Sequence, residues 1–307
     1  MAEQKPIVVV GSINIDLVMN TERIPVEGET ITGKDFQVHP GGKGANQAVA
    51  VGKLGYPVQM IGRVGSDAFG QQLRSNLEQS GVDTASVTTT EGSSGVAVIL
   101  VNAKGENCIV ITPGANAKLT PQDIDANVER IRSAGIVLTQ LETPLDTIEH
   151  LANLCEREGV PLMLDPAPAR ELPAQLLRKI TWFTPNETEA AFYCGASATA
   201  NNEPSAIAKQ LFDKGIEGVI LKLGSRGSYL ARPSETGHTI APFPVKAIDT
   251  TAAGDAFNGA FATALMMGKS EQESARFASA AAAISVTRKG AQPSLATMAE
   301  VQALLAK

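Results

Sequence analysis

The residues best placed to do chemistry lie in the segment DTTAAGDAFNG at 249–259. Ala252, Ala253 and Gly254 precede an apolar helical pattern, so their backbone N–H groups would stand bare at a helix N-terminus and form an anion site. Asp255 would repel a phosphate that is merely bound there. Its position makes sense if Asp255 is a general base that takes a proton from an attacking hydroxyl while the N–H groups hold the transferring phosphoryl. An ordinary N-cap aspartate explains the same spacing equally well.

A second glycine-rich segment, GGKGAN at 41–46, follows a predicted strand and opens a helix. Gly41 and Gly42 permit backbone angles closed to other residues, which suits either close approach of a ligand or a tight turn. The segment is not a dinucleotide-binding fingerprint, because Gln47 stands where a third glycine is needed, and the pattern GxxxxGK[ST] does not occur in the sequence. These observations disfavour a Rossmann oxidoreductase.

Polar residues follow two of the predicted strands. Asn14 and Asp16 come after the first strand, and Gln140 and Glu142 come after the strand at 136–138. Ligands of open α/β sheets bind outside the carboxyl ends of the parallel strands. Donors and acceptors paired at that edge predict a polyhydroxylated ligand rather than an apolar one.

Two further segments follow predicted strands, and spacing alone leaves two interpretations of each. The segment NETE at 186–189 would orient a hydrated magnesium ion or, equally well, cap a helix through Asn186. The segment LGSRG at 223–227 would cover the phosphates of a nucleotide or form a hairpin turn.

Composition bounds the class of protein. The chain has 307 residues, 43% of them hydrophobic, and a net charge of −6, which argues against a general nucleic-acid binder. Three cysteines without a CxxC pair predict a reducing, cytoplasmic location, and no apolar run approaches the roughly 20 residues of a membrane span. The histidines, at positions 39, 150 and 238, lie far apart, so we assign them no metal or triad role.

The elements that must position these residues follow from the hydrophobic pattern. Short apolar runs that suit buried parallel strands alternate with helical patterns, such as the one from Leu145 to Glu158 that stops at Gly159. The runs are Ile7–Val10, Val58–Ile61, Ile136–Leu138, Leu162–Leu164, Trp182–Phe183 and Val219–Leu223. This alternation predicts a three-layer α/β/α, Rossmann-like domain with a mostly parallel central sheet.

Two segments, about 15–40 and 94–112, break this rhythm, because each contains a strand pair without an intervening helix. We expect them to form one small β-sheet that stands off the main body as a lid. A sheet of this kind needs a covered face, so it should close over a ligand, another subunit or both. The whole chain, 1–307, is then one domain that carries this lid.

In combination, these segments resemble the ribokinase-like carbohydrate kinases, the PfkB family. The segment GKGANQA at 42–48 is similar to the N-terminal signature of that family, and DTTAAGDAFNG at 249–259 is similar to its C-terminal signature. Both occur in the expected order, and the resemblance covers nearly the whole chain. Further similarity within the family lies at 11–16, 166–169 and 287–294.

The resemblance implies ATP-dependent transfer of the γ-phosphoryl group to O5 of D-ribose, which gives D-ribose 5-phosphate. Asp255 would be the general base, and Ala252, Ala253 and Gly254 would supply the anion hole. A kinase for 2-deoxyribose, another sugar or a nucleoside remains an alternative within the enzyme class. A catalytically silent sugar-binding protein on the same fold is an alternative from another class.

The resemblance also implies three binding sites. The sugar hydroxyls, beneath the lid, would be bound by Asn14, Asp16, Gly42, Lys43, Asn46, Glu142 and Asp255. The nucleotide and its magnesium would be bound by Asn186, Glu189, Lys222, Leu223, Gly224, Ser225, Gly227, Gly254 and Ser279. A monovalent cation, potassium, would lie among Asp249, Thr251, Ser285, Arg288, Gly290 and Ser294 and would order the loop that carries the anion hole.

The sequence departs from the family pattern at Asp165, Lys222 and Ser279, which bears on nucleotide affinity. Proteins of this family often dimerise through their lids. The outer face of this lid is expected to carry Val98, Leu100 and Ile109, or the residues that alternate with them, so we expect a homodimer formed through the lid.

Overall fold

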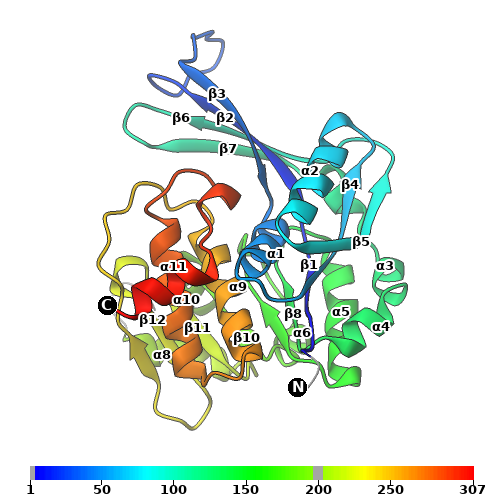
Figure 1. The fold of residues 1–307 in the computed structure, drawn as a ribbon, viewed down its shortest axis with the longest axis vertical. Coiled ribbons are helices and arrows are strands. Elements are labelled where there is room, and N and C mark those ends of the chain that lie inside the picture. Colours follow the sequence, from blue (N-terminus) through cyan, green and yellow to red (C-terminus); the bar gives the residue numbers. More distant parts are fainter. Residues whose placement is uncertain (1–3, 196–202) are drawn as a thin grey trace.

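The computed structural model describes residues 4–195 and 203–307. Its main body is built on a nine-stranded sheet in the order β13-β12-β11-β10-β9-β8-β1-β4-β5 (Figure 1). The strands are β1 (Ile7–Val10), β4 (Val58–Gly65), β5 (Val82–Thr90), β8 (Ile136–Thr139), β9 (Leu162–Leu164), β10 (Trp182–Phe183), β11 (Val219–Lys222), β12 (Ser228–Ala231) and β13 (His238–Ile240). All neighbours from β5 to β11 pair in parallel, and β12 and β13 continue the sheet antiparallel.

Helices cover both faces of this sheet. They are α1 (Lys43–Lys53), α2 (Ala68–Gln79), α3 (Pro121–Asp125), α4 (Val128–Ser133), α5 (Leu145–Glu158), α6 (Ala174–Leu177), α7 (Glu187–Cys194), α8 (Pro204–Phe212), α9 (Ala253–Met266), α10 (Glu271–Ser285) and α11 (Met298–Leu305). Side chains of β1 alternate between two cores, because successive residues of a strand point to opposite faces. Ile7 and Val9 pack with α1, α9 and α10, whereas Val8 and Val10 pack with α3, α5 and α8. The predicted three-layer architecture is confirmed.

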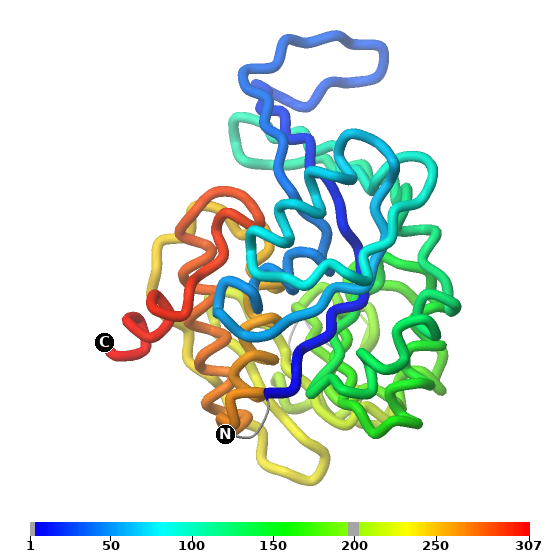
Figure 2. The backbone as a smooth tube through the Cα atoms, turned by 45° about the vertical axis from the view of Figure 1, so that its right-hand side comes forward, coloured from blue at the N-terminus to red at the C-terminus, as the bar shows by residue number. Residues whose placement is uncertain are grey.

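A separate four-stranded sheet, in the order β3-β2-β6-β7, extends from the top of the main body in Figures 1 and 2. Its strands are β2 (Asn14–Asn20), β3 (Asp35–Gly41), β6 (Gly95–Val101) and β7 (Asn107–Thr112). They come from the two helix-free segments of the sequence. We refer to these four strands as the small sheet.

The register of the small sheet separates its two faces. Leu17 lies opposite Val38 and Val98, and Val98 lies opposite Val110, so these four side chains form one row across all four strands. Val110 at the edge is 65% exposed. Ile109 pairs with Ile99 instead and therefore points to the other face, the face that carries Asp16. The expectation that Ile109 shares a face with Val98 and Leu100 was wrong, because neighbouring residues of a strand alternate.

Three local features position the candidate site. Strand β3 runs directly into α1 through Gly42, whose positive φ of 88° lies in a region that side chains rarely adopt. Helix α1 packs against α9 so closely that a Cβ atom at Gly259 would come within 2.8 Å of the Gln47 carbonyl oxygen. Strands β1, β8, β9 and β11 are parallel, so their carboxyl ends meet at the same edge of the sheet. In the part of the chain described here, no helix is long and apolar enough to span a membrane.

Candidate active site

Helix α9 begins where the sequence places its small residues. Ala252 is the N-cap with a left-handed backbone (φ 59°), and Ala252, Ala253 and Gly254 all line one cavity. The first N–H groups of a helix have no acceptor within the helix, so they are free to bind an anion at its positive end. The Ala253 N–H already donates to the Thr250 carbonyl oxygen at 3.2 Å, which leaves the N–H groups around Gly254 as the stronger anion donors.

Asp255 is not an N-cap. Ala252 holds that position, and the Asp255 carboxylate accepts hydrogen bonds from two α1 side chains, Asn46 Nδ2 to Oδ2 at 3.0 Å and Gln47 Nε2 to Oδ1 at 3.1 Å. The residue is only 4% exposed. Burial raises the pKa of Asp255 above its ordinary value, and the Lys43 ammonium opposes that rise. A buried carboxylate held beside an anion site is arranged to accept a proton.

Gln47 links Asp255 to a second carboxylate. The same Nε2 atom that donates to Asp255 lies 3.0 Å from Asp165 Oδ2, and Gln140 Nε2 donates to Gln47 Oε1 at 2.8 Å. The other oxygen of Asp165 accepts a hydrogen bond from Lys222 Nζ at 2.9 Å. Sequence reasoning did not assign a role to Gln47. The signal that the sequence carries for it is its place in the segment GKGANQA, directly after Asn46.

The predicted sugar-binding residues surround Asp255 on the side of the small sheet. Glu142 Oε2 accepts hydrogen bonds from Ser12 Oγ at 2.5 Å and from the Lys43 N–H at 3.2 Å. Asn14 Oδ1 accepts a hydrogen bond from Asn116 Nδ2 at 2.6 Å, a partner that the sequence analysis missed. The structure therefore brings these residues together from β2, α1 and the loop after β8.

Asp16 lies in the same cluster, and two observations show how tightly it is packed. A Cβ atom at Gly41 would come within 2.2 Å of Asp16 Oδ2, so the carboxylate occupies the space that only glycine leaves free. Burial raises the pKa of Asp16 to about 7, with further contributions from Glu142 and Asp255. Within the described residues, the buried Asn46 Oδ1 has no hydrogen-bond partner. An acceptor without a partner, beside two carboxylates, fits the hydroxyl groups of a sugar.

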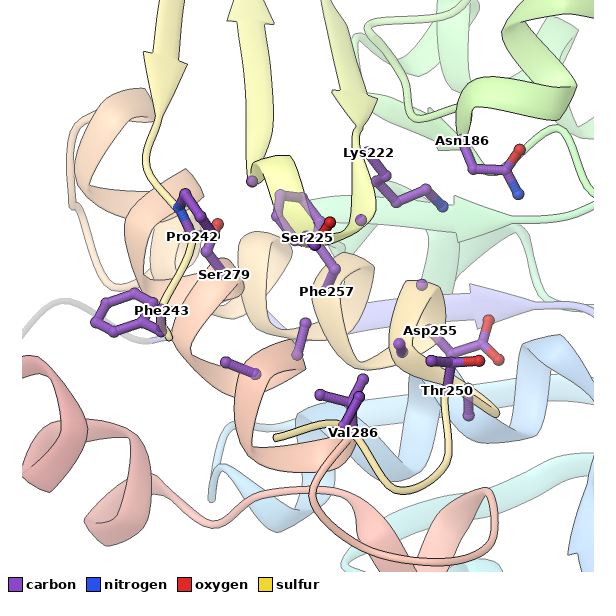
Figure 3. Close-up of a pocket in the computed structure, with 18 of the residues that line it drawn as sticks. Asn186, Lys222, Ser225, Pro242, Phe243, Thr250, Asp255, Phe257, Ser279 and Val286 are labelled. Carbon is purple, nitrogen blue, oxygen red and sulfur yellow. The ribbon is translucent and has the colours of Figure 1, made fainter. Parts of the chain in front are cut away.

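A cavity of about 750 Å³ is lined by Asp255 (Figure 3) and by Lys43 of the polar cluster. Of the residues predicted to bind the nucleotide, it is lined by Asn186, Glu189, Lys222, Gly224, Ser225, Gly227, Gly254 and Ser279. Leu223 contributes its side chain to the hydrophobic core instead. Pro242 and Phe243, which follow β13, form a further wall that sequence reasoning did not identify. The buried Ser279 Oγ has no partner in the described chain, which fits a polar group of a bound nucleotide.

Both interpretations of the segments at 186–189 and 223–227 have structural support. Asn186 and Glu189 form a capping box at the start of α7, with Glu189 Oε2 accepting from the Asn186 N–H at 2.8 Å and Asn186 Oδ1 accepting from the Glu189 N–H at 2.9 Å. Residues Gly224–Arg226 form a short 3-10 turn between the antiparallel strands β11 and β12. Both segments also line the cavity.

The residues predicted to surround a monovalent cation lie in the loop before α9, at the end of α10 and in the segment that follows α10. Asp249 Oδ2 accepts from the Gly290 N–H at 2.8 Å, and its Oδ1 accepts from Thr251 Oγ1 at 2.6 Å. Although burial opposes it, these hydrogen bonds hold the pKa of Asp249 below its ordinary value. Ser285 and Ser294 donate their hydroxyl groups to backbone carbonyls, and Arg288 forms an ion pair with Glu300. These segments present oxygen donors, which suit a hard cation.

Known proteins similar to this chain are carbohydrate kinases. Residues 4–298 match the family described as "pfkB family carbohydrate kinase". A ribokinase of Haemophilus influenzae is 43% identical over 97% of this chain and 97% of its own length, and a deoxyribokinase of Salmonella typhimurium is 40% identical over 94% of each. The solved structure of Arabidopsis thaliana ribokinase complexed with ribose and ATP is 38% identical, covers 99% of both chains and has a TM-score of 0.91.

The crowding of Asp16 generates a test of this geometry. The folded-state pKa of Asp16, about 7, lies above its ordinary value of 3.8. The fold therefore favours the protonated carboxyl group, and the stability that goes with it is present below about pH 4 and is lost as the pH rises from about 4 to about 7. We expect Asp16→Asn to raise the melting temperature by several degrees at pH 8 and by little at pH 4, on the order of 1–3 kcal/mol in the free energy of unfolding at the higher pH.

Thermal unfolding followed across this pH range checks the expectation. Asp35→Asn, which changes an exposed carboxylate on β3, is the matched control and should leave the pH profile as in the wild type. A stability difference between Asp16→Asn and the wild type that is the same at pH 4 and pH 8 would show that Asp16 is not held in a crowded acidic cluster.

Proposed function

The chain belongs to the pfkB family of carbohydrate kinases, and we propose that it transfers the γ-phosphoryl group of ATP to O5 of D-ribose, which gives D-ribose 5-phosphate and ADP. One observation carries this proposal. The buried Asp255 carboxylate lies in the first turn of α9, lines the large cavity and is hydrogen-bonded to Asn46, one of the polar residues predicted to bind the sugar. A kinase needs the phosphoryl acceptor, the base, the anion site and the phosphoryl donor to be arranged in this order.

In this mechanism Asp255 accepts the proton of the O5 hydroxyl as that oxygen attacks the γ-phosphorus, and the bond to the β-phosphate oxygen breaks to release ADP. Asn46 and Gln47 hold the carboxylate by one oxygen each, which fixes its orientation. The N–H groups around Gly254 stabilise the charge on the transferring phosphoryl. A positioned base contributes about 10²–10⁴-fold in rate, and one anion-hole donor about 3–4 kcal/mol.

Ribose is the acceptor that the polar cluster supports best. Asp16, Glu142 and Asn14 offer several acceptors at one edge of the sheet, and aromatic residues make up only 4% of the chain, which leaves little to stack against the base of a nucleoside. Similarity to the Salmonella typhimurium deoxyribokinase keeps 2-deoxyribose as the second candidate. Asn14 and Asp16 belong to β2 of the small sheet, so this sheet would act as a lid over the sugar that excludes water and suppresses hydrolysis of ATP.

Two ions complete the proposal. Asn186 and Glu189 would hold magnesium near the phosphates through its water shell, since this ion keeps several waters and both side chains line the cavity. Potassium would bind between the segments at 249–251 and 285–294 and order the turn that leads into α9. Supporting this, Asp249 and Gly290 already join the two segments immediately before the anion site.

Release of ADP by the purified protein with MgATP tests the function directly. We expect turnover with ribose, stimulated by potassium, and much lower turnover with fructose and adenosine. Turnover that is highest with 2-deoxyribose would move the protein to the second candidate and keep the mechanism. Ribose binding by calorimetry without any turnover would instead identify a silent sugar-binding protein.

The role of Asp255 makes a sharper prediction. Asp255→Asn should lower the turnover number by about 10²–10⁴-fold, because the amide cannot accept the proton, while ribose still binds. Asp213→Asn, at an exposed carboxylate next to α8, is the control and should have wild-type turnover. Near-normal turnover of Asp255→Asn in the same ADP-release assay would end the assignment of Asp255 as the base.

We also propose that the small sheet mediates a homodimer. Its row of Val38, Leu17, Val98 and Val110 forms an apolar stripe, and three of these side chains are 36%, 44% and 65% exposed. A second copy of the chain would cover this stripe around a two-fold axis.

Sedimentation at micromolar concentration tests the dimer. The wild type should have the mass of a dimer, and Val110→Lys, which places a charge at the exposed edge of the covered stripe, should shift it to a monomer with unchanged helical content. A wild-type monomer at these concentrations would remove the proposal.

A further inference from the structure

Two departures from the family pattern, Asp165 and Lys222, form one ion pair in the structure. Lys222 Nζ lies 2.9 Å from Asp165 Oδ1, and the two side chains are only 13% and 3% exposed. Lys222 ends β11 and Asp165 directly follows β9, so the pair bridges two strand ends across β10. A lysine has three donors, and a pair with one carboxylate oxygen leaves donors available for another acceptor.

The surroundings of Lys222 indicate what that second acceptor is. Lys222 lines the large cavity next to Asn186, with which it forms an isolated parallel bridge (Figure 3). A Cβ atom at Gly254 would lie 3.2 Å from Lys222 Nζ. The ammonium group therefore stands over the first turn of α9, where the positive end of the helix and the free N–H groups attract an anion.

The Lys222 side chain is fixed in this position before any ligand binds. Asp165 holds the ammonium through Oδ1, and its Oδ2 is held in turn by Gln47 Nε2 at 3.0 Å. The Lys222 backbone is also fixed, because its N–H donates to the Pro185 carbonyl oxygen at 2.9 Å. A charge held in this way loses little side-chain freedom when it binds a ligand, which strengthens the contact.

We propose that Lys222 contacts the γ-phosphate of the bound nucleoside triphosphate directly, with Asp165 as its positioning residue, and that this contact discriminates ATP from ADP. The proposal rests on the function above, because the anion site beside Gly254 receives the γ-phosphoryl only if Asp255 is the base. After transfer, ADP has no group at that position. Lys222 is then left with Asp165 alone, and the diphosphate is bound without its contribution.

Calorimetric titration with a non-hydrolysable triphosphate, MgAMP-PNP, and with MgADP tests the proposal in the absence of sugar. Lys222→Met keeps the length of the side chain and removes the charge. We expect it to raise the Kd for MgAMP-PNP by about 10- to 100-fold, the range for a hydrogen bond to a charged group, and the Kd for MgADP by less than about 3-fold.

The matched control is Lys209→Met. Lys209 is also an ion-paired lysine, 2.9 Å from Asp213, and it lies on α8, which packs against β11 outside the cavity. This variant should bind both nucleotides as the wild type does. Equal weakening of both nucleotides by Lys222→Met, or no weakening of either, would overturn the proposal.

A double variant separates direct contact from loss of stability or of net charge. Lys222→Met alone leaves the buried Asp165 carboxylate without its cation, which destabilises a fold. Lys222→Met with Asp165→Asn removes both charges, so the net charge of the cavity is unchanged and the melting temperature should recover. The loss of preference for MgAMP-PNP over MgADP should persist in the double variant. Recovery of the wild-type preference would show that Lys222 acts only through the structure or the overall charge.

Different results contradict the proposed function and the role of Lys222. A wild-type protein that binds neither nucleotide, or that releases no ADP with any sugar, contradicts the proposed function. A wild-type protein that binds both nucleotides and releases ADP, combined with a Lys222→Met variant that keeps the preference of the wild type, contradicts the role of Lys222 alone.

Discussion

The arrangement of the site depends on the contact between α1 and α9. Asp255 on α9 is almost fully buried, and a buried carboxylate is tolerated only where donors replace the water it has lost. Asn46 and Gln47 on α1 supply those donors, one to each oxygen. The two helices approach closely because Gly259 leaves room for the backbone of α1. The two glycine-containing signatures of the chain, far apart in the sequence, therefore form a single unit.

The topology of the sheet explains why this unit stands where ligands can reach it. The parallel strands β1, β8, β9 and β11 end at one edge of the sheet, and polar residues of the site lie at the end of each strand or in the segment that follows it. Asn14 and Glu142 follow β1 and β8 on one side of Asp255, and Lys222 ends β11 on the other. The buried hydrophobic clusters on both faces of the sheet hold these strand ends at fixed separations, so the polar side chains need little further support.

Much of this was predictable, and the remainder has a physical reason. Continuous apolar runs such as Ile7–Val10 have only one good location, the centre of a sheet covered on both faces, and the structure confirms it. The strands β5, β12 and β13 were not predicted, because polar residues interrupt β5 and because β12 and β13 are only four and three residues long. The pairing of Asp165 with Lys222 was also beyond the sequence, since the two residues are separated by 57 positions and meet only through the order of β9, β10 and β11. Side-chain partners of this kind follow from topology rather than from local pattern.

The charge around Asp255 differs between the small-sheet side and the cavity side of the site. On the side of the small sheet, burial raises the pKa of Asp16, and the nearby carboxylates of Glu142 and Asp255 raise it further, so that side disfavours a further anion and suits a neutral polyhydroxylated molecule. On the side of the cavity, the positive end of α9 and the Lys222 ammonium lie close together, and both would favour an anion such as a phosphate. Under the proposed function, this distribution of charge would favour a neutral sugar beside the small sheet and the phosphates of a nucleotide beside the N-terminus of α9. Transfer between them then requires only that the lid and the two helices hold the reacting atoms in line.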